Sequence, residues 1–287
     1  MTDESPRVWL ITGTSSGLGR AIAIAAAEAG DLVVATARKP ETLNDLVAAY
    51  PDQVQPARLD VTARDSLAPL VREVEERYGR IDVLVNNAGH GYVAAVEETP
   101  ESVLREMFEL HVFGSTALIR AVLPGMRARR RGAIVQMSSL AGHTAFAGFS
   151  AYCATKFALE GLSEALASEV TPLGIQVLLV EPGAFRTEFA PAAVPDATPS
   201  ADYQATVGLT RRVTQEMHGT QAGDPAKAAQ AILEALDTPA PPFRLALGHD
   251  AVDMIMAKLD AVAVEIREWE DVARSTDFGA DVLAGSH

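Results

Sequence analysis

The chain has 287 residues, 48% of them apolar, which is enough to bury the core of a large α/β domain. With 24 Lys and Arg against 38 Asp and Glu, the net charge of −14 argues against a nucleic-acid or anionic-membrane partner. A lone cysteine, Cys153, excludes an internal disulfide and a cysteine metal cluster. No apolar run suits a membrane span, and the acidic start is unlike a secretory signal, so a cytoplasmic protein is expected.

The first predicted strand covers residues 8–11, and a glycine-rich turn follows it at 12–19. A helix then extends to about Ala29. Such glycines let the backbone approach a ligand, and the helix N-terminus offers free N–H groups to a phosphate. A tight turn without a ligand is the alternative. The strand–turn–helix order favours a nucleotide site, formed by Gly13, Ser15, Ser16, Gly17, Leu18 and Gly19.

The second predicted strand, 32–36, bears on the choice of cofactor. A carboxylate is expected at its end when the cofactor carries a free ribose hydroxyl, but the sequence there is Ala37-Arg38-Lys39. The planar guanidinium of Arg38 matches the oxygens of a 2′-phosphate. Arg38 could also be an ordinary surface charge, but the missing acid favours NADP(H) over NAD(H).

Three further strands deliver polar residues at their carboxyl ends. A third strand ends at 59–62, a fourth at 81–85 leads into Asn86-Asn87-Ala88-Gly89, and a fifth at 133–137 delivers Ser138 and Ser139. A helix to about Tyr78 separates the first two of these strands. A long helix at 101–129 precedes the last, and the three arginines at 129–131 fit its C-terminal end.

A helix predicted at 151–170 carries Tyr152 and Lys156. Four residues are close to one helical turn, so the phenol and the ammonium share a face. A neighbouring cation favours the phenolate and lowers the tyrosine pKa, as an acid–base catalyst requires. The motif alone is weak, because an amphipathic helix with a half-exposed Tyr and a surface Lys has the same pattern. Its position thirteen residues after Ser139 strengthens it.

The last third of the chain loses the regular alternation. A strand at 175–180 ends at Glu181-Pro182-Gly183, and a proline-rich stretch follows it. Helices are predicted at 203–217 and 224–236, then a short strand at 243–247. A final helix at 251–272 has an apolar stripe typical of a core or a subunit interface. The expected fold is one Rossmann-type α/β domain over 1–287, a three-layer α/β/α doubly wound parallel sheet with a C-terminal helical extension. Its expected parts are a cofactor-binding part at 7–187, a substrate lid at 188–222 and a C-terminal strand and helix at 223–275.

Six motifs in this order resemble the short-chain dehydrogenase/reductase family. They are T-G-x-x-x-G-x-G at 12–19, D-V at 60–61, N-N-A-G at 86–89, Ser139, Y-x-x-x-K at 152–156 and P-G-x-x-x-T at 182–187. The stretches around Tyr152 and Pro182 are similar to bacterial members and to hydroxysteroid and retinol dehydrogenases. Oligomers are also implied, a homodimer or homotetramer formed through the helices at 101–129 and 151–170.

The resemblance implies a role for each matching residue. Tyr152 is the implied general acid in ketone reduction and base in alcohol oxidation. Lys156 holds the nicotinamide ribose and lowers the tyrosine pKa, and Ser139 bonds the substrate oxygen. The remaining implied cofactor-binding residues are Asp60, Val61, Asn87, Ala88, Gly89, Pro182, Gly183 and Thr187.

The sequence departs from the family pattern at His111. The family places a helical asparagine there, which holds a water linked to the lysine. An imidazole can also donate from one nitrogen and accept at the other, so we hypothesise that His111 supports the proton relay. It could also titrate near neutrality. A substituted helix residue with intact catalysis is the alternative.

The substrate pocket is expected to be apolar and aromatic, which favours a hydrophobic ketone or alcohol over a phosphorylated or multiply acidic substrate. Ordinary loop packing would explain the aromatic residues equally well. Two functions follow from these observations, an NADP(H)-dependent carbonyl reductase or a catalytically silent NADP-binding sensor. The expected pocket residues are His90, Tyr92, His143, Phe146, Phe149, Phe185 and Phe189.

Overall fold

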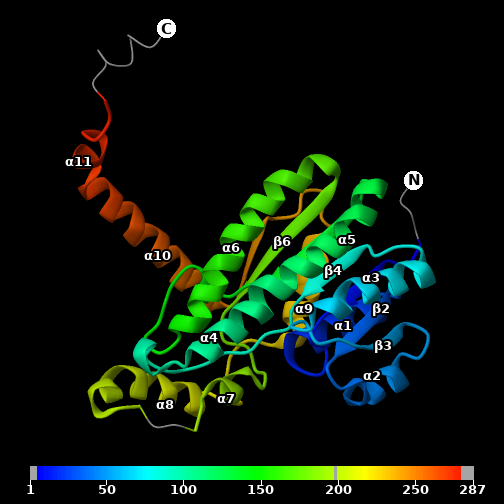
Figure 1. Cartoon of the computed structure of the whole chain (residues 1–287), viewed down its shortest axis with the longest axis horizontal. Helices are drawn as coiled ribbons and strands as arrows, with labels where there is room; N and C mark the ends of the chain where they lie inside the picture. The colour runs from blue at the N-terminus through cyan, green and yellow to red at the C-terminus, as the bar shows by residue number, and fades with distance from the viewer. Residues whose placement is uncertain (1–4, 197–198, 279–287) are drawn as a thin grey trace.

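Seven short segments rich in Val, Leu, Ile and Ala pair in parallel to form one sheet, in the order β3-β2-β1-β4-β5-β6-β7. The computed structural model describes residues 5–196 and 199–278, and Figure 1 shows helices on both faces of this sheet. The strands are β1 (Val8–Ile11), β2 (Leu32–Ala37), β3 (Val54–Arg58), β4 (Val83–Asn86), β5 (Gly132–Met137), β6 (Ile175–Pro182) and β7 (Arg244–Leu247).

Helices follow most strands and cover the sheet. None of the described helices combines the length and the hydropathy that crossing a membrane requires. The α-helices are α1 (Gly17–Glu28), α2 (Asn44–Ala49), α3 (Arg64–Tyr78), α4 (Glu101–Phe108), α5 (Ser115–Arg129), α6 (Ser150–Val170), α7 (Phe189–Ala193), α8 (Leu209–Glu216), α9 (Pro225–Asp237), α10 (His249–Glu268) and α11 (Glu270–Arg274).

Alternation along β1 shows how the two cores are divided. Trp9 and Ile11 face a core that includes residues of α1, α2 and α9. Val8 and Leu10 face the opposite core, formed with α3, α5 and α6. Because successive side chains of a strand point to opposite faces, a strand covered on both sides is apolar throughout. The three-layer α/β/α fold predicted from the sequence is therefore confirmed.

Strand β1 also marks the point where the chain order in the sheet reverses. It pairs with β2 on one side and with β4 on the other. In open α/β sheets a ligand crevice forms at such a switch point, beyond the carboxyl ends of the strands. The glycine-rich turn after β1 and the Asn86-Asn87 pair at the end of β4 meet there.

Several element boundaries differ from the sequence prediction. The third strand ends at Arg58, one residue before the predicted 59–62 segment, and α2 was not predicted. The helix predicted at 101–129 is interrupted by a π-helical segment, Glu109–Gly114, between α4 and α5. The last helix differs most, because α10 runs away from the body and buries only Ala251 and Ile255 (Figure 1).

Candidate active site

The glycine-rich turn is held in a shape that admits no side chains at two positions. Gly13 has φ +70°, and an added Cβ would lie 2.9 Å from the Cα of Ala88. A Cβ at Gly19 would collide with the side-chain amide of Asn87. That amide donates to the carbonyl oxygens of Thr12 (2.8 Å) and Gly13 (3.1 Å). Asn87 therefore stabilises the turn through these hydrogen bonds. The absence of a side chain at Gly19 allows α1 to pack closely against Asn87.

A cavity of about 1020 Å³ opens from this turn along the carboxyl ends of the strands. Ser139, Tyr152 and Lys156 line it together with nearly all of the predicted cofactor residues, and Gly19 is the exception. The other predicted cofactor residues along the cavity are Gly13, Ser15, Ser16, Gly17, Leu18, Arg38, Asp60, Val61, Asn87, Ala88, Gly89, Pro182, Gly183 and Thr187.

The turn end of the cavity fits the phosphate and adenosine parts of a dinucleotide. No side chain caps the N-terminus of α1, so its first N–H groups can serve a phosphate. Arg38 is exposed, and no hydrogen bond or close ion pair joins it to another described residue. The pKa of Asp60 is lowered, mainly because Thr62 donates hydrogen bonds to it and in smaller part because Arg38 and Arg58 lie nearby.

At the other end of the cavity, α6 presents Tyr152 and Lys156 beside the loop that carries Ser139. The Lys156 Nζ donates to the carbonyl oxygen of Met137 at 2.7 Å and lies 5.4 Å from the centroid of the Tyr152 ring. The Ser139 hydroxyl accepts a hydrogen bond from the Ala141 N–H at 3.1 Å. Backbone contacts therefore orient both the lysine and the serine beside the phenol.

The pKa of Tyr152 is raised, although the sequence predicted that Lys156 would lower it. Burial disfavours the phenolate and outweighs the opposing effect of the Ser139 hydroxyl. Burial also lowers the pKa of Lys156 to about 8, against the opposing charge of Glu160. The phenol of Tyr152 is therefore neutral at neutral pH, and Lys156 carries its charge there.

His111 lies in the π-helical segment, buried at the edge of Tyr152, with ring centroids 5.8 Å apart. Its Nε2 accepts a hydrogen bond from the His90 N–H at 3.2 Å. Its Nδ1 lies 2.8 Å from the Thr155 hydroxyl oxygen, whose own proton goes to the Tyr152 carbonyl oxygen. These partners assign the proton to Nδ1 and engage both ring nitrogens.

Burial also decides the charge of His111. Its pKa is lowered well below the usual value, chiefly by burial and then by the charge of Lys156. Titration of this ring near neutrality, one of the possibilities that the sequence left open, is therefore contradicted, because burial disfavours the charged imidazole. The two hydrogen bonds of His111 join the turn at His90 to Thr155 of α6.

The substrate end of the cavity is lined mainly by apolar side chains. Five of the seven predicted pocket residues line it: His90, Phe146, Phe149, Phe185 and Phe189. The Phe189 ring lies 5.3 Å from that of Tyr152. Tyr92 does not line the cavity and packs instead against a cluster of buried residues that includes Met107. Sequence reasoning missed Leu209, Val213, Met217 and Met254, although the amphipathic pattern of α8 is a signal for the first two.

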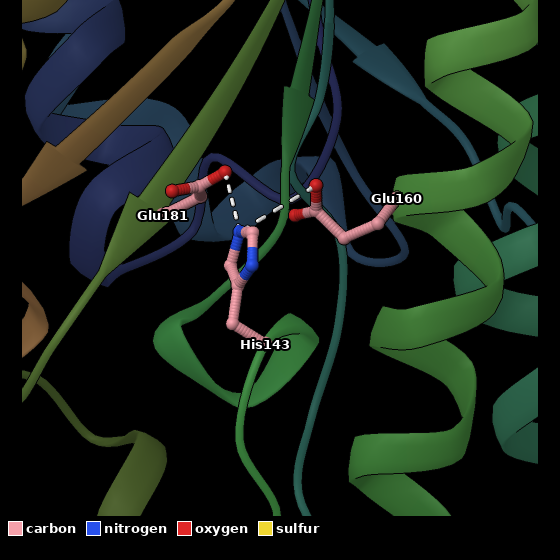
Figure 2. Close-up of side chains that lie close together, drawn as sticks. All are labelled: His143, Glu160 and Glu181. Atoms are coloured by element: carbon pink, nitrogen blue, oxygen red, sulfur yellow. Dashed lines mark hydrogen bonds and ion pairs between the residues drawn. The ribbon is translucent and has the colours of Figure 1, made fainter. Parts of the chain in front are cut away.

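His143 is the second predicted pocket residue that lies elsewhere (Figure 2). Its Nε2 lies 3.0 Å from Glu181 Oε1 and 3.9 Å from Glu160 Oε2. The prediction is wrong because the imidazole is hydrogen-bonded to the buried carboxylate of Glu181, outside the cavity lining. Arg244 joins them, with its Nε 3.3 Å from Glu181 Oε1 and 3.4 Å from Glu160 Oε2.

These four residues, His143, Glu160, Glu181 and Arg244, form a charge cluster behind the active site. The ligand atoms of the histidine and the two glutamates lie within 4.8 Å of one another, a spacing that could also hold a cation. The Arg244 guanidinium already supplies the positive charge, so an ion network explains the cluster. The sequence contains no local motif for this charge cluster, because its members come from four separate segments: the loop before α6, α6 itself, β6 and β7.

Comparison with known proteins agrees with the fold and the site. Residues 7–198 match the family model described as short chain dehydrogenase. The chain is 39% identical over 268 residues to oxidoreductase BOA17 of Botryotinia fuckeliana, covering 93% of this chain and 98% of that protein. It is 36% identical over 255 residues to a 3-ketodihydrosphingosine reductase of Bacteroides thetaiotaomicron, covering 88% and 91%. A crystal structure of a short-chain dehydrogenase from Streptomyces avermitilis superposes with a TM-score of 0.90 at 56% identity, covering 96% of this chain and all of that one.

Proposed function

The chain belongs to the short-chain dehydrogenase/reductase family, and on this premise we propose that it is an NADP(H)-dependent oxidoreductase of hydrophobic carbonyl compounds and alcohols. The observation that carries the proposal is the convergence of Ser139, Tyr152 and Lys156 at one end of a cavity whose other end is the glycine-rich turn. A ketone or aldehyde and its alcohol are the interconverted pair.

Each of the three side chains has its own role in this proposal. The nicotinamide supplies or accepts the hydride. Tyr152 donates its phenolic proton to the carbonyl oxygen in reduction and takes it back in oxidation, and its raised pKa favours the proton-donating form. Ser139 donates a hydrogen bond to the same oxygen. Lys156 holds the nicotinamide ribose and stabilises the phenolate after proton transfer.

The preference for NADP(H) rests on Arg38. The second strand ends without a carboxylate at this position, and the exposed guanidinium lies on the cavity wall without a hydrogen-bond partner among the described residues. A 2′-phosphate is the group that such a site accepts, because the planar fork of an arginine pairs with phosphate oxygens.

The substrate class follows from the pocket. Beyond the catalytic residues the wall consists largely of Phe, Leu, Val and Met side chains from α7, from α8 and the residue after it, from α10 and from the loop before α6. Its charged residues there are the acids Glu106, Glu188 and Asp250, which disfavour an anionic substrate. The relative named 3-ketodihydrosphingosine reductase is consistent with a long apolar ketone.

A catalytically silent NADP-binding sensor is the second candidate. It is favoured by one observation, that both nitrogens of His111 are engaged and offer no free site for a relay water. The presence of Ser139, Tyr152 and Lys156 in contact with one cavity favours the enzyme.

Loss of NADPH absorbance with a panel of long-chain and bulky ketones tests the proposal. Tyr152→Phe is expected to lower the rate by roughly 10²–10⁴-fold with NADPH binding retained. The matched control Tyr50→Phe removes an exposed hydroxyl bonded to Glu28 and keeps full activity. A sensor would bind NADPH and turn over no ketone in any of the three proteins.

The cofactor preference is tested in the same assay. Arg38→Ala is expected to raise the KM for NADPH and leave that for NADH nearly unchanged. Equal effects on both cofactors would contradict the role given to Arg38.

A further inference from the structure

The turn after β6, residues 183–187, connects the two ends of the cavity, and four of its five residues line it. It begins beside Ser139, whose hydroxyl oxygen lies 3.5 Å from the carbonyl oxygen of Pro182. It ends beside the glycine-rich turn, where a Cβ added at Gly17 would lie 3.4 Å from the Thr187 Cγ2. A cofactor that reaches from the glycine-rich turn to Ser139 therefore runs along the β6 turn.

A side chain from the C-terminal part of the chain holds this β6 turn. Asp250 lies in the first turn of α10, and its Oδ2 accepts a hydrogen bond from the Ala184 N–H at 2.7 Å, across 66 positions of sequence. The preceding N–H, that of Gly183, donates to the main-chain carbonyl oxygen of Leu247 at 2.9 Å. The carboxylate of Asp250 therefore fixes the β6 turn at the point where the main-chain pairing of the sheet ends.

The packing of two glycines shows how closely the Asp250 carboxylate approaches the β6 turn. A Cβ added at Gly183 would lie 2.1 Å from the Asp250 Oδ1 and 2.3 Å from its Cγ. A Cβ added at Gly248 would lie 2.6 Å from the same Oδ1. Gly183 has a negative φ, which other residues also adopt, so the close contact with Asp250 is what requires glycine there.

An acidic residue in the first turn of a helix often serves only its own helix, through the dipole or the free N–H groups. Asp224 does so in α9, where its carboxylate accepts a hydrogen bond from the Ala226 N–H at 2.9 Å. No side chain caps α10, and the hydrogen bond of Asp250 goes to the β6 turn instead. Asp250 also lines the cavity. Its carboxylate is therefore placed for the cavity rather than for α10.

We propose that Asp250 is a positioning residue for the nicotinamide half of the cofactor, and that it acts through the β6 turn. Without this carboxylate the Ala184 N–H loses its partner, and the space beside Gly183 lets the β6 turn move. The phosphate and adenosine parts are expected at the glycine-rich turn and at Arg38, so their binding does not depend on this contact. Helix α10, which runs away from the body, is thereby joined to the active site by its first turn (Figure 1).

The inference rests on the proposed use of NADP(H), but it concerns the binding of the cofactor and not the chemical step. Two ligands separate the halves of the site: NADPH, and adenosine 2′,5′-bisphosphate, which lacks the nicotinamide half. Titration calorimetry of the full-length protein measures the affinity for each ligand without any turnover.

Asp250→Ala should weaken NADPH binding by about tenfold, because one hydrogen bond to a charged acceptor is lost, and should leave the affinity for adenosine 2′,5′-bisphosphate unchanged. Asp250→Asn keeps a side-chain oxygen that can accept from the Ala184 N–H, so it should bind NADPH like the wild type. Asp253→Ala is the matched control, because Asp253 is exposed on α10 outside the cavity lining, and it should bind both ligands like the wild type.

Gly183→Ala tests the same contact from the other side. The added Cβ displaces the Asp250 carboxylate while Asp250 itself remains, so the variant should show the same selective loss of NADPH affinity. In the ketone assay, Asp250→Ala should lower kcat by about 10–100-fold at saturating NADPH, because a misplaced nicotinamide reacts slowly, and Asp250→Asn should restore it.

Equal weakening of both ligands in Asp250→Ala would show a general structural role and would overturn the proposal. Unchanged NADPH affinity in Asp250→Ala or in Gly183→Ala would also overturn it, as would a failure of Asp250→Asn to recover that affinity. A wild type that reduces no ketone would contradict the proposed activity, while a selective loss of NADPH affinity in Asp250→Ala would still support this inference. A wild type that binds neither ligand would contradict both.

Discussion

Two successive parts of helix α6 carry buried ionisable side chains, and their surroundings differ. Tyr152 and Lys156 face the cavity, where Lys156 is charged with a backbone carbonyl as its hydrogen-bond partner. Glu160, one turn beyond Lys156, faces the charge cluster of His143, Glu181 and Arg244. The part around Lys156 keeps a positive charge that is costly to bury but can interact with a ligand in the cavity. In the second part, opposite charges meet and join four segments of the fold.

The difference between these two parts of α6 should appear in the free energy of unfolding. The pKa of Lys156 falls from 10.5 to about 8, so the unfolded chain binds this proton more tightly. Below pH 8 the buried charge therefore destabilises the fold by up to roughly 3 kcal/mol, and this cost disappears as the pH rises towards 10.5. In the charge cluster the loss of one partner leaves the others uncompensated. The two parts should thus respond to mutation with opposite signs.

Lys156→Met should give the largest effect. Activity should fall by about 10²-fold or more, because the phenolate loses its neighbouring cation. Stability at pH 7 should rise by about 1–3 kcal/mol, and this gain should vanish near pH 10.5. Urea unfolding of the variant and the wild type at pH 7 and pH 10 measures whether the free energy of unfolding rises or falls. Lys227→Met, at an exposed site on α9, is the control and should show no such gain. A loss of stability at pH 7 would contradict the interpretation.

Arg244→Met tests the other side of the comparison. Glu160 and Glu181 are almost fully buried, and without the guanidinium their charges face each other. Because Arg244 is itself 35% exposed, we expect a loss of about 1–3 kcal/mol, below the range for a fully buried pair. Activity should fall less than in Lys156→Met, since Arg244 lies outside the cavity lining.

The control for this loss is Arg20→Met, which breaks an ion pair with the 75% exposed Asp45 and should change the free energy of unfolding very little. Equal effects of the two arginine substitutions on urea unfolding would show that burial of the charge cluster carries no special weight.

The comparison also explains what sequence reasoning could predict. The strands, the glycine turn and the Tyr152/Lys156 pair were predicted because each depends on residues close together in the chain. His143 was assigned to the pocket by its position before α6, but its partners Glu160 and Glu181 lie 17 and 38 positions further on. Electrostatic attraction between such distant segments has no local pattern, so its effect on a loop side chain could not be read from the sequence.

Two other departures have the same cause. The pKa of Tyr152 was expected to fall because a cation is its neighbour in the motif, but burial by residues from several elements raises it. The apolar stripe predicted along the last helix is mostly exposed on α10, because a stripe does not reveal which surface, if any, of the same chain will cover it. Burial and partnership are properties of the whole fold, and a local motif carries little information about either.

Glu160→Gln should give the smallest effect and links the two parts of α6. The Glu160 charge raises the pKa of Lys156, so its removal should lower that pKa below its present value of about 8. Lys156 loses its charge as the pH rises, so the alkaline limb of the activity profile should move to lower pH.

Glu164→Gln, which removes an exposed carboxylate that also pairs with Arg244, is the matched control and should leave the limb in place. An unmoved limb in Glu160→Gln would mean that the charge cluster acts only on stability. A shift of the alkaline limb in Glu160→Gln but not in Glu164→Gln would show that the charge of Glu160 sets the pKa of Lys156 across a single turn of α6.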